Sequence, residues 1–135
     1  MPCRYLLDTN IASYVIKGNF PAVRRRLVRH PPSEIAISSV TEGVLRYGVA
    51  RRPEAARLAA VVDEFLLRVE VLPWDSDAAR QYGQLRATLE REGRPIGSLE
   101  TMIGAHALAC GLILITHDRA FGRIKGLKVQ DWTKP

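Results

Sequence analysis

Short apolar segments of strand length alternate along this chain with longer segments of helical character. Strand-like segments occupy residues 3–7, 35–38, 69–72 and 112–116, and a final edge strand is predicted at 127–132. Apolar residues at helical spacing fill the segments 11–17, 21–29, about 40–49, about 55–67, about 76–92 and 98–111. This alternation predicts an α/β domain with a largely parallel central sheet. A length of 135 residues fits one domain spanning 1–135.

The chain is basic, with a formal net charge of +6. Such a charge on a small domain favours polyanionic partners, nucleic acid first, and a solvated basic surface explains it equally well. The longest apolar run, near 108–116, is shorter than the roughly 20 residues that cross a bilayer, so no membrane partner is expected. Cys3 and Cys110 lie outside any metal-binding spacing, and no signal-peptide pattern is present. These features favour free thiols in a reducing cytoplasm, and a disulfide stays open.

Four acidic residues fall at or near the carboxyl ends of predicted strands. Asp8 ends the first strand, and Asp118 follows the 112–116 strand by two residues. Glu42 and Glu100 lie in the first turns of two predicted helices. Each acid alone has an ordinary structural explanation, because carboxylates cap helices, favour helix N-termini and hold turns.

Taken together, the four acids indicate a functional site. In open parallel sheets, ligands bind beyond the carboxyl ends of the strands. Carboxylates that converge there repel one another, which raises their pKa values, and a hard divalent cation relieves the repulsion. Such a cation orients and activates water for hydrolysis. In a basic protein, this arrangement suggests cleavage of a nucleic-acid backbone.

Four sequence blocks resemble those of the PIN-domain family, and more narrowly the VapC toxins of VapBC toxin–antitoxin pairs. In chain order they read LLDTNIASYVIKG, ISSVTEGVLRYGV, GRPIGSLETMIGAHALACGLILIT and HDRAFGRIKGLKVQDW. The resemblance implies a three-layer α/β/α fold with a mainly parallel central sheet of four to five strands. It also implies an endoribonuclease that depends on Mg²⁺ or Mn²⁺ and cuts structured RNA, often tRNA. A homodimer and inhibition by a VapB-like antitoxin are further implications.

The resemblance also assigns roles to individual residues. Asp8 corresponds to the first family acid, Glu42 to the second and Asp118 to the variable fourth. The implied supporting polar residues are Thr9, Asn10 and Thr116. Glu100 stands where the family usually carries aspartate, which moves the carboxylate outward by one methylene. The predicted catalytic residues are therefore Asp8, Glu42, Glu100 and Asp118, of which Asp8, Glu100 and Asp118 are the predicted metal ligands.

Two further features bear on binding. Three cations lie just after Asp118 and are candidate RNA contacts: Arg119, Arg123 and Lys125. The 55–69 segment carries more apolar residues than one buried face needs, so it is a candidate dimer seam or antitoxin groove. His117 adjoins Asp118, but a lone loop histidine carries no assignment.

Two other functions remain open. The substitution of Glu100 for aspartate is compatible with a binding module that holds RNA and antitoxin with a weakened catalytic site. A phosphoryl-transfer hydrolase using Asp8 as nucleophile is a third reading. Such enzymes generally carry a second acid two residues after the first, where this chain has Asn10.

Overall fold

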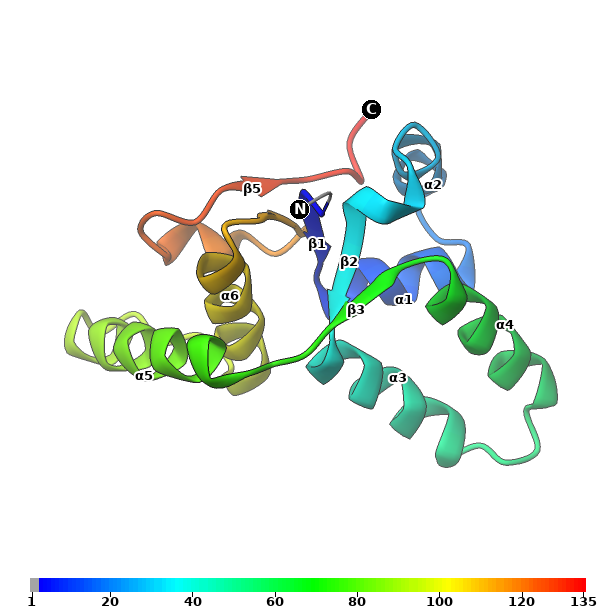
Figure 1. The fold of residues 1–135 in the computed structure, drawn as a ribbon, viewed down its shortest axis with the longest axis horizontal. Helices are drawn as coiled ribbons and strands as arrows, with labels where there is room; N and C mark the ends of the chain where they lie inside the picture. Colours follow the sequence, from blue (N-terminus) through cyan, green and yellow to red (C-terminus); the bar gives the residue numbers. More distant parts are fainter. Residues whose placement is uncertain (1–2) are drawn as a thin grey trace.

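A five-stranded parallel sheet forms the centre of the protein in a computed structural model, which describes residues 3–135 (Figure 1). The strand order is β3-β2-β1-β4-β5, and all four neighbouring pairs are parallel. The strands are β1 (Tyr5–Leu7), β2 (Ile35–Ser38), β3 (Glu70–Leu72), β4 (Ile113–Ile115) and β5 (Val129–Gln130). The predicted parallel sheet of four to five strands is confirmed, with five.

Helices cover both faces of this sheet and complete the three-layer arrangement (Figure 1). One face carries α1 (Thr9–Lys17), α2 (Pro21–Leu27), α3 (Ser39–Ala50) and α4 (Ala56–Leu67). The opposite face carries α5 (Ser76–Arg91) and α6 (Ser98–Cys110), and two short 3-10 helices lie at Pro32–Glu34 and Arg119–Arg123. No helix within residues 3–135 is both long enough and apolar enough to cross a membrane.

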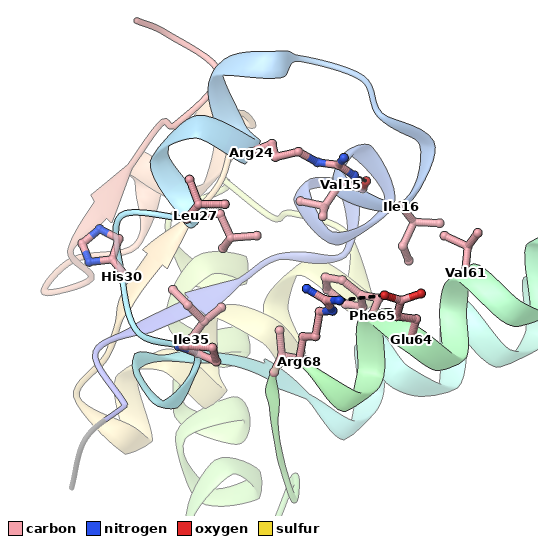
Figure 2. Close-up of a pocket in the computed structure, with 13 residues that line it drawn as sticks. Val15, Ile16, Arg24, Leu27, His30, Ile35, Val61, Glu64, Phe65 and Arg68 are labelled. Atoms are coloured by element: carbon pink, nitrogen blue, oxygen red, sulfur yellow. Dashed lines mark hydrogen bonds and ion pairs between the residues drawn. The ribbon is translucent and has the colours of Figure 1, made fainter.

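Helices α1, α2 and α4 enclose a groove of about 660 Å³ on the first face (Figure 2). Apolar side chains line most of this groove, which we call the α1–α2–α4 groove. They are Val15, Ile16, Leu27, Val28, Ile35, Val61, Phe65 and Val69. Charged groups at its margin include Arg24 and the ion pair between Arg68 and Glu64.

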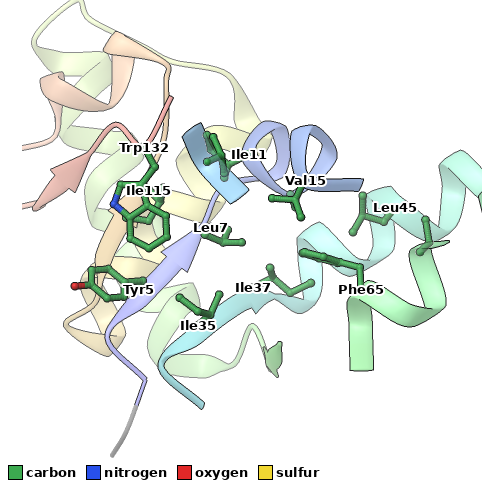
Figure 3. Close-up of a cluster of buried hydrophobic side chains, with 13 residues drawn as sticks. Tyr5, Leu7, Ile11, Val15, Ile35, Ile37, Leu45, Phe65, Ile115 and Trp132 are labelled. Atoms are coloured by element: carbon green, nitrogen blue, oxygen red, sulfur yellow. The ribbon is translucent and has the colours of Figure 1, made fainter. Parts of the chain in front are cut away.

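The larger core cluster lies between this helical layer and the sheet (Figure 3). Successive residues of β1 point to opposite faces, so Tyr5 and Leu7 enter this cluster while Leu6 enters the cluster under α5 and α6. Because both faces are covered, the three central strands, β1, β2 and β4, are largely apolar on both sides. That explains why the sequence presents them as continuous apolar runs.

Several element boundaries differ from the sequence prediction. Helix α1 begins two residues earlier than predicted, since the Asp8 side chain caps it, and Thr9 and Asn10 are therefore helical. Gly97 occupies the N-cap position of α6, which begins at Ser98 as predicted. Strand β5 is shorter than the predicted 127–132. Both cysteines are free thiols, but only Cys3 is buried.

Leucine-to-alanine substitutions test the importance of the sheet core. Leu114, in the central part of the sheet, has no exposed surface, whereas Leu67, at the end of α4, is 87% exposed. We expect Leu114→Ala to lower the free energy of unfolding by about 2–5 kcal/mol, because it leaves a cavity. The same substitution at Leu67 should change it by no more than about 0.5 kcal/mol. Urea unfolding measures both, and equal losses would contradict this description of the core.

Candidate active site

The Asp8 carboxylate is buried where β1 ends and α1 begins. Only 4% of the surface of Asp8 is exposed. The backbone N–H of Ile11 donates to Asp8 Oδ1 at 2.8 Å, which caps α1. A carboxylate at this position is also favoured by the positive end of the helix dipole. Asp8 therefore has a structural role as a cap in addition to any chemical one.

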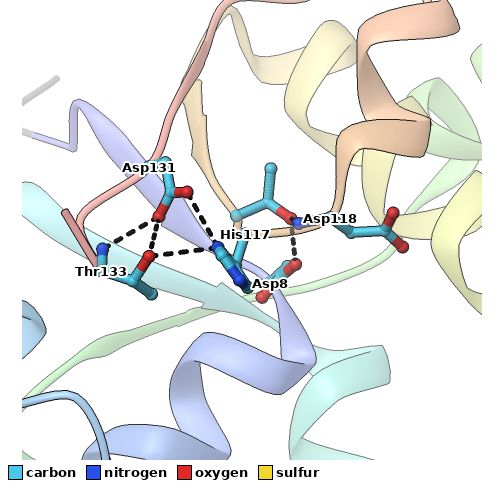
Figure 4. A network of polar contacts seen from close by, with 6 residues as sticks. Asp8, His117, Asp118, Asp131 and Thr133 are labelled. Atoms are coloured by element: carbon cyan, nitrogen blue, oxygen red, sulfur yellow. Dashed lines mark hydrogen bonds and ion pairs between the residues drawn. The ribbon is translucent and has the colours of Figure 1, made fainter.

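Thr116 joins Asp8 to the neighbouring strand β4. Its hydroxyl donates to Asp8 Oδ2 at 2.5 Å and accepts from the backbone N–H of Asp118 at 3.0 Å (Figure 4). The backbone N–H of Asp8 donates to Ile115 O at 3.0 Å. One hydroxyl thus fixes two acidic residues that are 110 positions apart in the chain.

Neighbouring charges identify the acids that approach Asp8. Burial is the largest cause that raises the pKa of the Asp8 carboxyl, and the negative charges of Asp118 and Glu100 raise it further. The hydrogen bonds from Thr116 and Ile11 oppose this shift without cancelling it. Three of the four predicted acids therefore interact at the carboxyl edge of the sheet.

The Glu100 carboxylate lies at the N-terminus of α6, folded back over Gly97. A side chain at residue 97 would bring its Cβ into collision with that carboxylate. Gly97 therefore leaves the space that the longer glutamate side chain occupies. This packing accommodates the extra methylene relative to aspartate.

Glu42 forms an ion pair within its own helix, α3. Its Oε2 accepts from Arg46 Nε at 2.9 Å and lies 2.8 Å from Arg46 Nη2. Adjacent residues on a helix point about 100° apart, so Glu42 and the residue before it face in different directions. The preceding residue, Thr41, is buried, and its hydroxyl lies 3.0 Å from that of Thr9. Thr41 therefore faces the site and Glu42 turns toward Arg46.

The remaining predicted residues occupy the exposed rim. Asn10, Arg119 and Lys125 are exposed. Arg123 Nη1 donates to Pro95 O at 3.1 Å, which ties the segment after Asp118 to the loop before α6. Within residues 3–135, none of these three cations forms an ion pair with a carboxylate.

A second polar network adjoins the acids and was not predicted from the sequence. His117 Nδ1 lies 2.9 Å from Asp131 Oδ2 and 3.1 Å from Thr133 Oγ1 (Figure 4). Partial burial raises the pKa of Asp131, but the hydrogen bonds from Thr133 and His117 outweigh it and leave that pKa below its usual value. The pairing of β5 with β4 brings these residues together.

Comparisons with known proteins agree with this arrangement. A family model described as the PIN domain matches residues 5–127. The tRNA(fMet)-specific endonuclease VapC of Shigella flexneri is 40% identical over 131 residues, covering 96% of this chain and 98% of the relative. The chain belongs to the VapC ribonucleases of the PIN-domain family.

Two solved structures of VapBC complexes share the fold of this VapC chain. The DNA-bound VapBC of Salmonella typhimurium matches with a TM-score of 0.90 and 38% identity, over 96% of this chain and 98% of that one. VapBC2 from Rickettsia felis, bound to a promoter DNA fragment, matches with a TM-score of 0.88 and 32% identity, over 95% of this chain and 98% of that one. The resemblance inferred from the sequence blocks is confirmed.

The acids of this VapC chain fit a divalent cation that keeps some of its water. PIN-domain nucleases generally use such ions. Three interacting carboxylates suit a hard cation, since oxygen ligands are preferred. Among residues 3–135, however, no three His, Cys, Asp or Glu side chains lie close enough together to enclose an ion directly. A divalent cation that retains several waters matches this looser arrangement.

Replacing Asp8 by asparagine should stabilise the protein at neutral pH. The folded pKa of Asp8 is raised, so its stabilising contribution is complete below the unfolded pKa and is lost as the pH rises through the folded pKa. We expect Asp8→Asn to raise the melting temperature at neutral pH, with a gain that shrinks as the pH falls toward 3.8. Asparagine still caps a helix well.

The control for this experiment is Asp75→Asn. Asp75 caps α5 through Ala78 N–H at 3.1 Å, but it is exposed. Thermal unfolding across pH should reveal no comparable gain for this variant. A destabilised Asp8→Asn at neutral pH would contradict the assigned burial cost.

Proposed function

We propose that this VapC ribonuclease is the toxin of a type II toxin–antitoxin pair and hydrolyses phosphodiester bonds in structured RNA, with tRNA as the substrate class. The observation that carries the proposal is the buried Asp8 carboxylate, which interacts with Asp118 and Glu100 at the carboxyl edge of the sheet. The relative from Shigella flexneri is named for action on tRNA(fMet). The net charge of +6 suits an RNA substrate.

In this proposal Asp8, Glu100 and Asp118 hold Mg²⁺, or Mn²⁺ in its place. When bound, the ion would lower the pKa of a coordinated water and neutralise charge on the phosphate. The chain itself keeps the ligands in position. Thr116 holds Asp8 by one carboxylate oxygen and Ile11 N–H holds the other, so the carboxylate plane is fixed. Asp118 Oδ1 accepts from Ala120 N–H at 2.9 Å, which anchors that side chain as well.

The exposed cations after Asp118 are the proposed contacts to RNA phosphates. Arg119 and Lys125 are solvent-accessible in the segment that follows the acid. Arg123 is fixed by Pro95 O and so holds this segment against the loop before α6. Phosphate contacts of this kind position the RNA without reading its sequence.

The α1–α2–α4 groove is the proposed site for a VapB-like antitoxin (Figure 2). Its apolar lining suits an amphipathic segment of a partner, and Arg24 and Arg68 at its margin suit acidic residues on that segment. The two solved structures described above are VapBC complexes. A homodimer and a cytoplasmic location, where tRNA is found, complete the proposal.

Cleavage assays with Asp8→Asn test the ribonuclease. Purified protein with Mg²⁺ or Mn²⁺ should cut tRNA, and the asparagine variant should cut at least about 100-fold more slowly, since removing a group that merely orients a ligand already costs up to that much. Removal of the ion with EDTA should stop the parent chain. Undiminished cleavage by folded Asp8→Asn, with contaminating nucleases excluded, would overturn the proposal.

Glu42→Gln separates the four acids predicted by sequence from the three that interact in the structure. Because Glu42 pairs with Arg46, we expect its loss to slow cleavage by no more than about threefold, as expected for an exposed helix pair. The matched control is Glu90→Gln, since Glu90 pairs with Arg86 in the same way on α5. If Glu42→Gln slowed cleavage as much as Asp8→Asn does, Glu42 would be a catalytic residue.

A second candidate function is an RNA- and antitoxin-binding module with weak catalysis. It is favoured by one observation, the Glu100 carboxylate that is folded back over Gly97. Glu100→Asp tests it, because the shorter side chain withdraws the carboxylate from Gly97. If the parent is a full ribonuclease, the variant should cut no faster than the parent. A gain of about tenfold or more in single-turnover rate would favour the weakened module.

A further inference from the structure

Three aromatic rings from separate segments meet beside the acidic group. Tyr14 of α1 and Phe20, just before α2, have ring centroids 4.7 Å apart. Phe20 and His117, in the loop after β4, have centroids 5.7 Å apart. We call Tyr14, Phe20 and His117 the aromatic shelf. One of its members, His117, lies between Thr116 and Asp118 in the chain.

Phe20 has an unusual backbone for its residue type. Its φ of 51° lies in the left-handed region, and it is the one non-glycine residue with positive φ among the described residues. It also occupies the N-cap position of α2 without any side-chain hydrogen bond to the helix. Glycine or asparagine would adopt this backbone with less strain. The large ring nevertheless stays 40% exposed, so packing alone accounts poorly for it.

His117 is held in a fixed orientation at the other end of the shelf. Its Nδ1 faces Asp131 and Thr133, which leaves Nε2 on the opposite side of the ring. The ring is exposed although its anchor residues are half-buried. Two parts of the chain, the α1–α2 connection and the C-terminal segment, thus position rings at the same rim. The Phe20 ring is tilted by 51° to that of Tyr14 and by 47° to that of His117, so each ring presents its own face.

The surroundings of the shelf suit a single-stranded nucleic acid. Asn10 lies four residues before Tyr14 on α1 and therefore on the same helix face, which continues the rim toward Asp8. A hollow of about 310 Å³ beside Tyr14 is lined also by Gly18, Pro21 and Arg25. Aromatic rings interleaved with cations are the usual means of binding unpaired bases.

We propose that the aromatic shelf stacks an unpaired nucleobase of the RNA and so positions the adjacent backbone at the acidic group. This inference rests on the proposed ribonuclease function and names the part of the RNA that the site recognises. A single-stranded loop or end presents such a base, whereas a regular duplex keeps its bases stacked and paired.

Binding of a short fluorescent oligouridine to the Asp8→Asn chain, which does not cut it, tests the shelf. We expect Phe20→Leu in that background to weaken binding by about fivefold or more, because leucine keeps apolar bulk but removes the flat ring. The dependence of affinity on salt should keep its slope, since stacking releases no counterions. Fluorescence anisotropy over a salt series measures both quantities.

Matched controls separate stacking from general effects. Phe20→Tyr restores a ring and should bind within about twofold of the parent, well inside the loss expected when stacking is removed. Tyr47→Leu removes a ring that is 65% exposed on α3 and should leave affinity unchanged. A short RNA duplex should bind Phe20→Leu and its parent equally. In chains that retain Asp8, Phe20→Leu should raise KM for tRNA and leave kcat unchanged.

The outcomes distinguish the shelf from the ribonuclease. If Phe20→Leu binds oligouridine like its parent, or loses duplex and single strand alike, the shelf is overturned while metal-dependent cleavage by the parent still supports the ribonuclease. If the Asp8→Asn chain binds no RNA and the parent cuts none, both proposals fail. Should Phe20→Leu not fold, Phe20→Asn replaces it, because asparagine tolerates the left-handed backbone.

Discussion

The structure depends on how the buried Asp8 carboxylate is satisfied. Removing a charged group from water is costly unless hydrogen bonds replace the lost hydration. Ile11 N–H supplies one bond from within α1, and the Thr116 hydroxyl supplies another from the end of β4. The second bond requires β4 to lie directly beside β1, which is the strand order observed. Local helix capping and long-range sheet topology therefore meet at one carboxylate, and neither alone would leave it adequately bonded.

The same arrangement explains why the site is acidic within a basic protein. Asp118 follows β4 and Glu100 begins α6, so parallel strands and the helices packed on them deliver acids to one edge. Burial, and after it repulsion from Asp118 and Glu100, raise the pKa of Asp8, which is unfavourable for folding at neutral pH but favours a bound cation. The cations that follow Asp118 in the chain, Arg119, Arg123 and Lys125, are exposed, and exposed cations of this kind favour a polyanion. An acidic centre that favours a cation, together with a basic rim that favours a polyanion, suits a nuclease.

Sequence patterns predicted the features that depend on short-range order. The alternation of strands and helices predicted the parallel sheet, and Asp8 and Asp118 lie, as predicted, just after β1 and β4. Glu42 stays a prediction as a catalytic residue, since the structure shows it paired with Arg46. Adjacent residues on a helix point about 100° apart, so the burial of Thr41 beside it depends on how α3 packs on the sheet. Asp131 and Thr133 could not be predicted, because their contact with His117 depends on the register between β4 and β5. The position of the Phe20 ring could not be predicted either, because no local sequence motif indicates the left-handed backbone of this residue.

The C-terminal segment links the core to the rim of the site. Trp132 is fully buried and packs edge-on against Tyr5 at 5.1 Å and stacked on His30 at 5.3 Å. Its two neighbours, Asp131 and Thr133, turn to the other side and hold His117. An anchored tryptophan therefore fixes the flanking polar residues, even though β5 is only two residues long. Because His117 also contacts Phe20, the order of the rim depends on the last residues of the chain as well as on its first strand.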